Sequence, residues 1–420
     1  MSAVATPTSS APAAVAASAD RTDRAPRKVS RVIIASINRA EGDTGVHTHA
    51  RMLRTGLADA GVTCDCVGPF DGSRKWLPVF AFRPLVLHRL NKTWSTLWHR
   101  RWHMAAVREN LVRRLSRMPA DVVLAQCPVS ARAALDARDA LRGNWPVVLV
   151  CHFNHSEASE YRDKGELSDS RRYHAMLDFE AKVLEGVDRV IYVSNWARDN
   201  VEAVRGLRTR SSAVVWNGVS ENDGTIGATS GPAPLTRAAL GLAADAIVLV
   251  NVGSIEPRKN QLGLIDLFAA VAARFEKAKL VLVGDGPQRG EVEEKVAERR
   301  LKGSVLFLGH RRDVPAILPA ADLYVHYSML ENCPLALLEA ARAGLPVAAV
   351  PAGGVPELQA ALDCKLDIDP ADVRGTLGRL QPILEDVALR REAGERARKA
   401  FEKTFTRESM TQAYLRALTF

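Results

Sequence analysis

The chain has 420 residues, of which 47% are hydrophobic and 25% are charged, and its formal net charge is +9. This length exceeds what one hydrophobic core usually organises, so we expect two globular domains. The sequence contains no apolar run of about 18 or more residues, and a membrane-spanning helix is therefore not predicted.

Residues 1–29 are rich in Ala, Ser, Thr and Pro and end in basic residues. The positive charges follow the apolar stretch instead of preceding it, which argues against a signal peptide and predicts a disordered tail. The six cysteines are scattered, and no pair has CxxC spacing. We interpret them as reduced thiols of a cytoplasmic protein, and no metal site is predicted from them.

Between residues 31 and 350, short apolar runs alternate with amphipathic helical patterns. In the first half, the runs that predict strands are 31–36, 62–68, 121–126, 146–151, 189–194 and 212–217. Nearly continuous apolar strands that alternate with helices indicate a parallel sheet covered on both faces. They define a first domain, 30–218, which is followed by a polar linker with Gly and Pro, 219–236.

The same alternation resumes after the linker. The runs that predict strands here are 246–252, 279–285, 304–309, 322–327 and 346–350. Helical patterns lie between them, for example at 262–275 and 334–343, and the end of the chain is predicted to be helical. The predicted fold class is therefore α/β, with two doubly wound, Rossmann-like domains facing each other across a cleft. The second domain is 237–400, and we expect a last helix, 401–420, to pack back on the first domain.

Two glutamates, Glu331 and Glu339, flank a predicted helix start at Pro334. Because doubly wound sheets bind ligands beyond the carboxyl ends of their strands, Glu331 stands where a ligand is expected. The amides at this helix N-terminus, which can meet sugar hydroxyls or phosphate, belong to Asn332, Cys333 and Leu335. Glu339 follows inside the helix among Leu and Ala, where a carboxylate needs a partner such as a ribose diol. Each glutamate alone fits a solvated side chain, but the pair favours a binding site.

The segment VGSIEPRKNQ follows a predicted strand and opens the next predicted helix. Its adjacent Arg258 and Lys259 suit a diphosphate, and Gly253 lets the backbone approach closely. The alternative is a solvated basic helix start, which is unfavourable at the positive end of the helix dipole. We therefore favour phosphate binding. The later GDG at 284–286 lacks the third glycine of a dinucleotide fingerprint and predicts a plain turn.

The first domain offers Gly45, at a helix start, and His152, at the end of the strand PVVLVC. Gly45 would bring the backbone close to donor phosphates. A histidine after a strand is more often structural than catalytic, but the position of His152 at the predicted cleft favours a catalytic role. His155, three residues later, is a weaker candidate. The charged region 152–172 is expected to help select the acceptor.

Together, these segments resemble glycosyltransferase family 4, the large retaining group with the GT-B fold. The similarity rests on VGSIEPRKNQ, LVLVGDGP, AGGVPEL and the run from VLFLGH to AGLPV, and on VIYVSNWARDNV and VVWNGV before them. It extends from residue 31 to residue 415 and is stronger in the second domain. The resemblance implies a sugar donor linked to UDP or GDP and a glycan, lipid-linked or small-molecule hydroxyl acceptor. It also implies that no metal or other cofactor is needed.

The resemblance assigns the leaving group and the sugar of the donor to the second domain. Lys259, with Arg258 nearby, would stabilise the diphosphate. Glu331 and the amides after it would hold the sugar hydroxyls, and Glu339 would bind the ribose. One position departs from the family, which commonly has Arg directly after the glycine where this chain has Ser254. This removes one phosphate-binding cation, and Arg258 is the expected substitute.

On the first domain, the resemblance assigns Gly45 to phosphate and His152 to the reacting face of the sugar. Lys259, Glu331 and His152 are therefore the predicted catalytic residues. Two other functions stay open: a GT-B epimerase or phosphorylase acting on sugars, or a non-catalytic protein that binds a sugar nucleotide or a membrane. Ser254 alone favours the non-catalytic alternative.

The segment 74–117 carries eleven Lys and Arg against one acid, Glu109, which gives a net charge of +10. Three of its tryptophans are spaced by four and so lie on one helical face, with arginines beside them. This pattern is typical of a helix on an anionic membrane surface and predicts a peripheral protein at the inner face of the cell membrane. The residues predicted for membrane contact are Trp94, Trp98, Arg100, Arg101 and Trp102. Alternatively, the tryptophans pack inward or bind the acceptor. A nucleic-acid partner is not predicted, because no recognisable nucleic-acid-binding module accompanies the positive charge.

Overall fold

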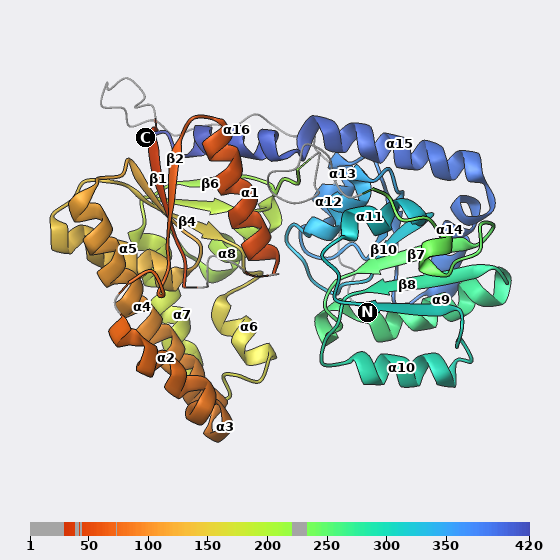
Figure 1. Ribbon diagram of the computed structural model, residues 1–420, viewed down its shortest axis with the longest axis horizontal. Coiled ribbons are helices and arrows are strands. Elements are labelled where there is room, and N and C mark those ends of the chain that lie inside the picture. Colours follow the sequence, from red (N-terminus) through yellow and green to blue (C-terminus); the bar gives the residue numbers. More distant parts are fainter. Residues whose placement is uncertain (1–28, 38–41, 43, 73, 221–232) are drawn as a thin grey trace, which may run out of the picture.

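The computed structural model describes residues 29–37, 42, 44–72, 74–220 and 233–420 (Figure 1). Nearly all of the predicted disordered tail, 1–29, and most of the predicted linker, 219–236, lie outside these described residues. Val29, at the end of that tail, is buried against the core.

The first half of the chain forms one parallel six-stranded sheet in the order β2-β1-β3-β4-β5-β6. Its strands are β1 (Arg31–Ala35), β2 (Thr63–Val67), β3 (Val122–Ala125), β4 (Val147–Cys151), β5 (Arg189–Tyr192) and β6 (Ser212–Val214). Each lies within a strand predicted from the sequence. The strands run parallel because the chain between successive strands crosses back over the sheet, mostly as a helix.

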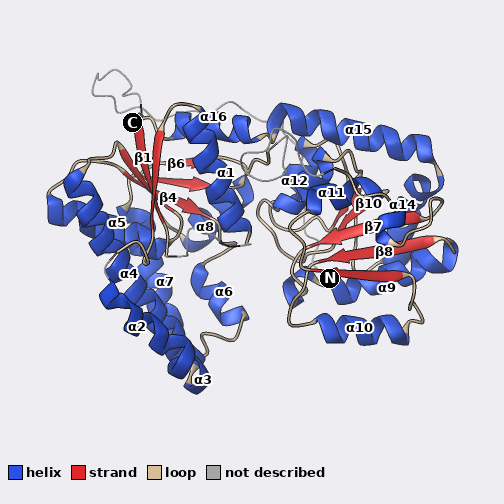
Figure 2. Cartoon of the chain, in the orientation of Figure 1, coloured by secondary structure: helices blue, strands red, loops and turns tan. Residues whose placement is uncertain are grey.

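Helices cover both faces of this first sheet (Figure 1, Figure 2). They are α1 (Gly45–Asp59), α2 (Leu77–Phe82), α3 (His88–Leu90), α4 (Lys92–Arg117), α5 (Pro128–Leu141), α6 (Glu157–Asp163), α7 (Ser170–Gly186) and α8 (Asn195–Arg205), with short turns η1 (Arg74–Trp76) and η2 (Arg83–Leu87). Apolar side chains of α4, α5, α7 and α8 pack on one face. Helix α1 and the last helix, α16 (Arg407–Ala417), pack on the other face.

The second half forms another parallel six-stranded sheet, in the order β12-β11-β10-β7-β8-β9. Its strands are β7 (Ile247–Val252), β8 (Ala278–Val283), β9 (Val305–Gly309), β10 (Leu323–His326), β11 (Val347–Ala349) and β12 (Leu366–Asp367). Five of them were predicted. The sequence prediction omits β12 because two residues at a sheet edge carry no periodic pattern and are defined only by their pairing with β11.

The helices of the second half again lie on both faces of their sheet (Figure 2). They are α9 (Gln261–Arg274), α10 (Arg289–Glu298), α11 (Val314–Ile317), α12 (Leu335–Arg342), α13 (Val355–Ala361), α14 (Val373–Glu385) and α15 (Val387–Thr404), with short turns η3 (Ala238–Leu240), η4 (Pro257–Lys259) and η5 (Leu318–Ala320). Helices α9, α10 and α14 share one core cluster. Helices α12, α13 and α15 share the other.

One core cluster connects the two sheets. It includes residues of β1 and β7 and continues through Phe405, in the turn from α15 to α16. Helix α15 lies on the second domain, and α16 returns to the first (Figure 1). There the Tyr414 hydroxyl lies 3.0 Å from His49 Nε2 on α1. The doubly wound two-domain architecture, which the GT-B resemblance implies, is confirmed.

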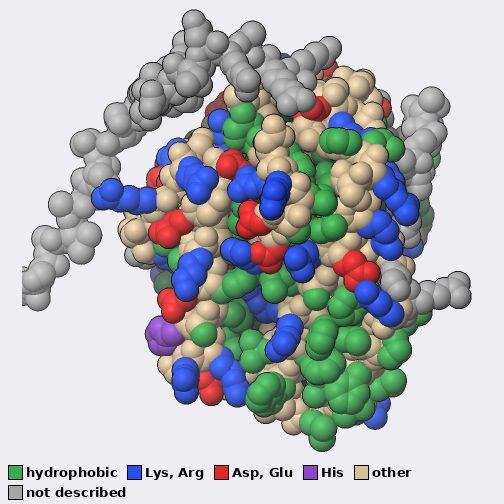
Figure 3. Space-filling model, turned by 90° about the vertical axis from the view of Figure 1, so that its left-hand side faces the viewer, with side chains coloured by type: hydrophobic (Ala, Val, Ile, Leu, Met, Phe, Trp, Pro, Cys, Tyr) green, Lys and Arg blue, Asp and Glu red, His purple; other side chains and the backbone are tan. Residues whose placement is uncertain are grey.

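Of the five residues predicted for membrane contact on α4, the structure contradicts Arg100, which is buried, and leaves Trp98 and Trp102 only partly exposed. Trp98 and Trp102 turn toward α2 and η1, and Trp98 Nε1 donates to the Val79 carbonyl at 3.0 Å. Arg100 is 7% exposed and forms an ion pair with Glu157. Helical spacing cannot reveal these contacts, because the segment before α4 folds back over it only in the tertiary structure. Of the five residues, Trp94 and Arg101 stay exposed. Figure 3 shows the side of the molecule that carries α2 and α3 (lower left in Figure 1), and hydrophobic side chains gather at the lower right of that view.

Candidate functional site

The two predicted phosphate-binding cations lie at the carboxyl end of β7. Arg258 and Lys259 belong to the short turn η4, which precedes α9; that helix begins at Gln261, the last residue of the segment predicted to open it. Asn260 separates them from the helix: it adopts a left-handed conformation with φ 51°, and its side chain accepts from the Gly263 amide at 3.1 Å. The cations are therefore held just outside the helix, where its positive end does not oppose them as directly.

Both cations converge on Glu331, which follows β10. Arg258 Nη1 lies 2.7 Å from Glu331 Oε1, Lys259 Nζ contacts the same oxygen, and Arg258 Nη2 lies 2.9 Å from Glu256 Oε1. Burial alone would raise the pKa of Glu331, but the charges of Lys259 and Arg258 outweigh it and lower the pKa to about 2. Glu331 is therefore ionised at neutral pH and holds the two cations side by side.

The backbone of Glu331 is fixed by two glycines that follow β11. Gly353 has φ 68°, and a Cβ on it would lie 2.1 Å from the Glu331 carbonyl oxygen. The Gly354 amide donates to that same oxygen at 2.8 Å. The Gly354 amide therefore positions Glu331.

His326, the last residue of β10, lies close to this ion-paired cluster and was not singled out from the sequence. Burial, and then the charge of Lys259, lowers its pKa to about 3. Its Nδ1 lies 3.2 Å from the Tyr324 hydroxyl. Sequence reasoning missed His326 because it stands inside an otherwise apolar strand pattern, so that no local signal separates it from the core.

On the opposite domain, His152 follows β4 and is partly exposed. Its Nε2 lies 3.0 Å from Gln126 Oε1, and its ring lies edge-on to His49 with the centroids 4.8 Å apart. Burial, and then the proximity of His49, holds the pKa of His152 well below its usual value. His152 is therefore neutral at physiological pH. Tyr414 supports this arrangement through its contact with His49, and neither of these two residues was predicted.

The loop after β10 also joins the two domains. Asn332 Nδ2 donates to the Phe153 carbonyl at 2.8 Å, and Asn217 Nδ2 donates to the Cys333 carbonyl at 2.7 Å. On the other side of this loop, a Cβ on Gly45 would lie 4.0 Å from Leu335 Cδ1. The N-termini of α1 and α12 therefore approach each other, which brings the predicted donor residues of both domains together.

Glu339 lies on α12, one helical turn beyond Leu335, and is half-buried. Burial, then Glu339 and Glu331, raises the pKa of Tyr324 well above its usual value. Both carboxylates are therefore close enough to act on the buried Tyr324 hydroxyl.

Glu357 of α13 is a functional candidate that the sequence analysis left without a role. Its carboxylate accepts from the backbone amides of Asn195 at 3.0 Å and Trp196 at 2.6 Å, at the N-terminus of α8. This is a favourable site for an anion because the first amides of a helix have no partner within it. Glu357 therefore connects the domains, a role that only the tertiary structure reveals.

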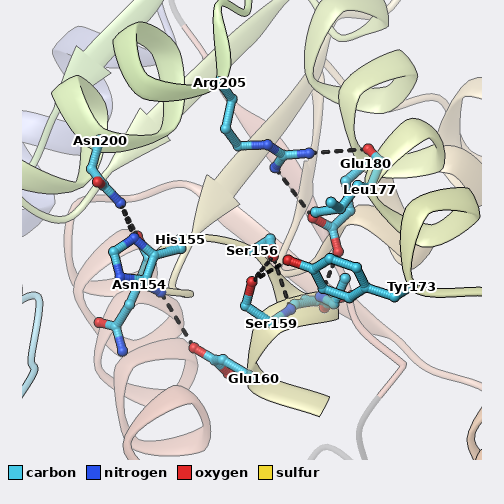
Figure 4. A network of polar contacts seen from close by, with 12 residues as sticks. Asn154, His155, Ser156, Ser159, Glu160, Tyr173, Leu177, Glu180, Asn200 and Arg205 are labelled. Atoms are coloured by element: carbon cyan, nitrogen blue, oxygen red, sulfur yellow. Dashed lines mark hydrogen bonds and ion pairs between the residues drawn. The ribbon is translucent and has the colours of Figure 1, made fainter. Parts of the chain in front are cut away.

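A polar network fixes the loop that follows His152 (Figure 4). Glu160 Oε1 accepts from the Asn154 amide at 3.3 Å, and Glu180 accepts from the Ala158 amide at 2.8 Å while pairing with Arg205. Burial, and then the charge of Glu157, raises the pKa of Glu180 to about 7. Figure 4 also shows His155 turned toward Asn200 of α8. The predicted acceptor-selecting region is thus held by contacts within the first domain and, at Phe153, by the hydrogen bond from Asn332 of the second domain.

Two further properties hold for the residues that the structure describes. Within them, no group of three or more His, Cys, Asp or Glu side chains is arranged to hold a metal ion. No helix among them combines the length and hydrophobicity needed to cross a bilayer.

Comparison with known proteins points to one group of enzymes. Residues 233–400 match the family model described as glycosyl transferases group 1, and residues 44–223 match that of glycosyltransferase family 4. The chain is 30% identical over 167 residues to N-acetyl-alpha-D-glucosaminyl L-malate synthase of Bacillus anthracis, which is 40% of this chain and 44% of that protein. It is 29% identical over 213 residues to the lipopolysaccharide core biosynthesis glycosyltransferase LpsE of Rhizobium meliloti, which is 51% of this chain and 62% of that protein. In both cases the match spans less than two thirds of the relative.

Among solved structures, Anabaena HepE in complex with UDP-glucose superposes with a TM-score of 0.67 at 18% identity. The superposition covers 92% of this chain and 99% of HepE. At this identity the likeness concerns the fold alone.

Proposed function

The chain belongs to the group 1 glycosyltransferases of family 4, and from this premise we propose that it transfers a sugar from a nucleotide diphosphate sugar to a hydroxyl acceptor. The donor is linked to UDP or GDP, the configuration at the anomeric carbon is retained, and no metal takes part. The acceptor is a glycan, a lipid-linked sugar or a small molecule. The proposed setting is the cytoplasm, at the inner face of the cell membrane.

The observation that carries this proposal is the convergence of Arg258 and Lys259 on Glu331 beyond the carboxyl ends of β7 and β10. The diphosphate gains negative charge as its bond to the sugar breaks, and two cations already held together would stabilise it without reorganising during the reaction. The amides at the start of α12 would add partial positive charge. Arg258 would substitute for the arginine that the family commonly has at the position of Ser254.

The reaction proposed for this site breaks the bond between the anomeric carbon and the diphosphate oxygen, and the bonding electrons pass to that oxygen. The acceptor hydroxyl oxygen bonds to the anomeric carbon on the same face, and its proton passes to the departing phosphate. Glu331 would hold the sugar hydroxyls and Glu339 the ribose. His152, held neutral, would accept or donate a hydrogen bond at the sugar without adding a charge that repels the developing oxocarbenium ion.

The test is donor turnover by Lys259→Met. We expect turnover of the accepted UDP- or GDP-sugar to fall about a hundredfold, because one of the two leaving-group cations is lost. The matched control is Lys277→Met, which removes an exposed lysine paired with Asp245 on the same domain. NMR of the product identifies the anomer and separates transfer from epimerisation or phosphorolysis. Unchanged turnover in a folded Lys259→Met protein would show that the leaving group does not bind here.

A further inference from the structure

One end of the first domain carries a group of exposed hydrophobic side chains, which we call the tip patch. Its members come from α2, η2, α3 and the start of α4: Leu77, Phe82, Leu85, Val86, Leu90 and Trp94. Leu85 is 65% exposed, Leu90 is 77% exposed and Trp94 is 53% exposed. In Figure 3 hydrophobic side chains gather at the lower right of the side where these elements lie, and exposed hydrophobic groups of this kind often mark a binding surface.

The segment that carries the tip patch is fixed to the domain by its other face. Phe82 packs against Trp98 with ring centroids 5.3 Å apart, and Arg83 Nε donates to Ser95 Oγ at 3.1 Å. The Val79 carbonyl accepts from Trp98 Nε1. These contacts hold the segment against α4, and the exposed leucines take no part in them. The exposed leucines are therefore available to an external partner.

The charge around the tip patch has one sign. From residue 72 to residue 108 the sequence contains eight Lys and Arg and no Asp or Glu. Arg89 and Lys92, beside Leu90, are exposed and form no ion pair with any residue that the structure describes. Exposed hydrophobic side chains next to unpaired cations fit the surface of an anionic bilayer, where apolar acyl chains lie below negatively charged headgroups.

We propose that the tip patch docks on an anionic lipid bilayer, with its leucines and Trp94 in the interfacial layer and Arg89 and Lys92 at the headgroups. A second copy of the chain fits less well, because a two-fold contact would place these cations against each other. The elements also project from the end of the domain (Figure 1), a shape that a fluid bilayer accommodates. This inference extends the proposed function by naming the membrane surface, but the docking itself does not depend on catalysis.

The tip patch is continuous with the region that borders the cleft. The Arg172 guanidinium lies 4.5 Å from the Trp94 ring centroid, and Thr96 Oγ1 donates to Glu166 at 3.2 Å. Arg172 lies in the first turn of α7, which contacts α6 in the loop network that follows His152. Docking would therefore bring the acceptor side of the cleft toward the bilayer.

The test is sedimentation of the full chain with vesicles at low salt. The vesicles are phosphatidylcholine alone or phosphatidylcholine with about one third phosphatidylglycerol. We expect retention on the anionic vesicles, weakened by added salt because the Debye length shortens. The double variant Leu85→Glu with Leu90→Glu should lower the partition coefficient by about tenfold or more, because two apolar side chains no longer enter the interface. Arg89→Glu with Lys92→Glu should lower it about tenfold on anionic vesicles and change it little on neutral ones.

The matched control is Val387→Glu, since Val387 is 66% exposed on α15 of the other domain. It should bind vesicles like the unmodified chain, and thermal unfolding should show that all variants are folded. The inference is overturned if anionic vesicles do not retain the chain or if the double leucine variant is retained equally well. It is also overturned if sedimentation velocity shows that the unmodified chain is a dimer, that the double leucine variant is a monomer, and that this variant still binds vesicles. Lys259→Met should bind vesicles normally, so failure of the catalytic proposal and failure of docking give different results.

Discussion

The loops beyond β7 and β10 and the tip patch of the first domain both carry adjacent cations, but they use them in opposite ways. In the second domain, Arg258 and Lys259 share one oxygen of the mostly buried Glu331. At the tip, Arg89 and Lys92 remain exposed next to Leu90. A charge that is desolvated and paired fixes the geometry of a site, whereas a charge left in water attracts a partner without defining its orientation. The comparison predicts that changes at the first place alter chemistry and folding, while changes at the second alter only binding to a surface.

The largest effect is expected from Glu331→Gln, which keeps the shape of the side chain but removes the charge that holds both cations. Donor turnover should fall about a hundredfold, because the leaving-group cations lose their fixed position. Steady-state kinetics with the accepted sugar nucleotide measures the loss. The control is Glu293→Gln, an exposed glutamate paired with Arg289 on α10. Equal turnover in Glu331→Gln and the control would contradict the role given to Glu331.

The next effect concerns the backbone that supports Glu331. Gly353→Ala places a Cβ 2.1 Å from the Glu331 carbonyl oxygen at a φ of 68°. We expect the free energy of unfolding to fall by about 2 kcal/mol or more, and turnover to fall with it. Gly378→Ala in α14, where nothing lies within 4 Å, should instead stabilise by about 0.5–1 kcal/mol. Urea unfolding of the two variants checks the contrast, and equal stabilities would refute it.

A pH effect is expected from His326. Its folded pKa of about 3 lies below the ordinary value of 6.5, so between these values the unfolded chain binds more protons than the folded one. The free energy of unfolding therefore falls as pH drops below 6.5, by about 2 kcal/mol at pH 5 for this side chain alone. His326→Gln should show a smaller decrease between pH 8 and pH 5 in urea unfolding. An identical decrease in both proteins would mean that His326 titrates normally.

The smallest effect on stability is expected at the tip patch. Leu90→Ser should change the free energy of unfolding by less than about 0.5 kcal/mol, since Leu90 is 77% exposed and loses little packing. Leu337→Ser on α12, which is fully buried, should cost several times more. Thermal unfolding of both variants measures the difference. A large loss in Leu90→Ser would show that the patch packs against something within the chain.

The sequence by itself determined the α/β class, eleven of the twelve strands and the placement of Glu331, Arg258, Lys259 and His152 at strand ends. These features are local: apolar strands and the residues that follow them are adjacent in the chain, and parallel strands must end at the same edge of a sheet. The same local pattern predicted that the segment with these cations opens the next helix, and α9 begins at Gln261, directly after its N-cap Asn260.

Only the tertiary structure decided whether a side chain on a given helical face is exposed to solvent or covered by another segment of the chain. The spacing of Trp98 and Trp102 predicts one helical face but not whether another segment lies on it, and here the segment before α4 does. The same is true of His49 and Tyr414, which are 365 residues apart in sequence and in contact in space, and of Glu357 at the start of α8. Such contacts depend on how the domains and the returning helix α16 pack, and no periodicity within a short window records that packing.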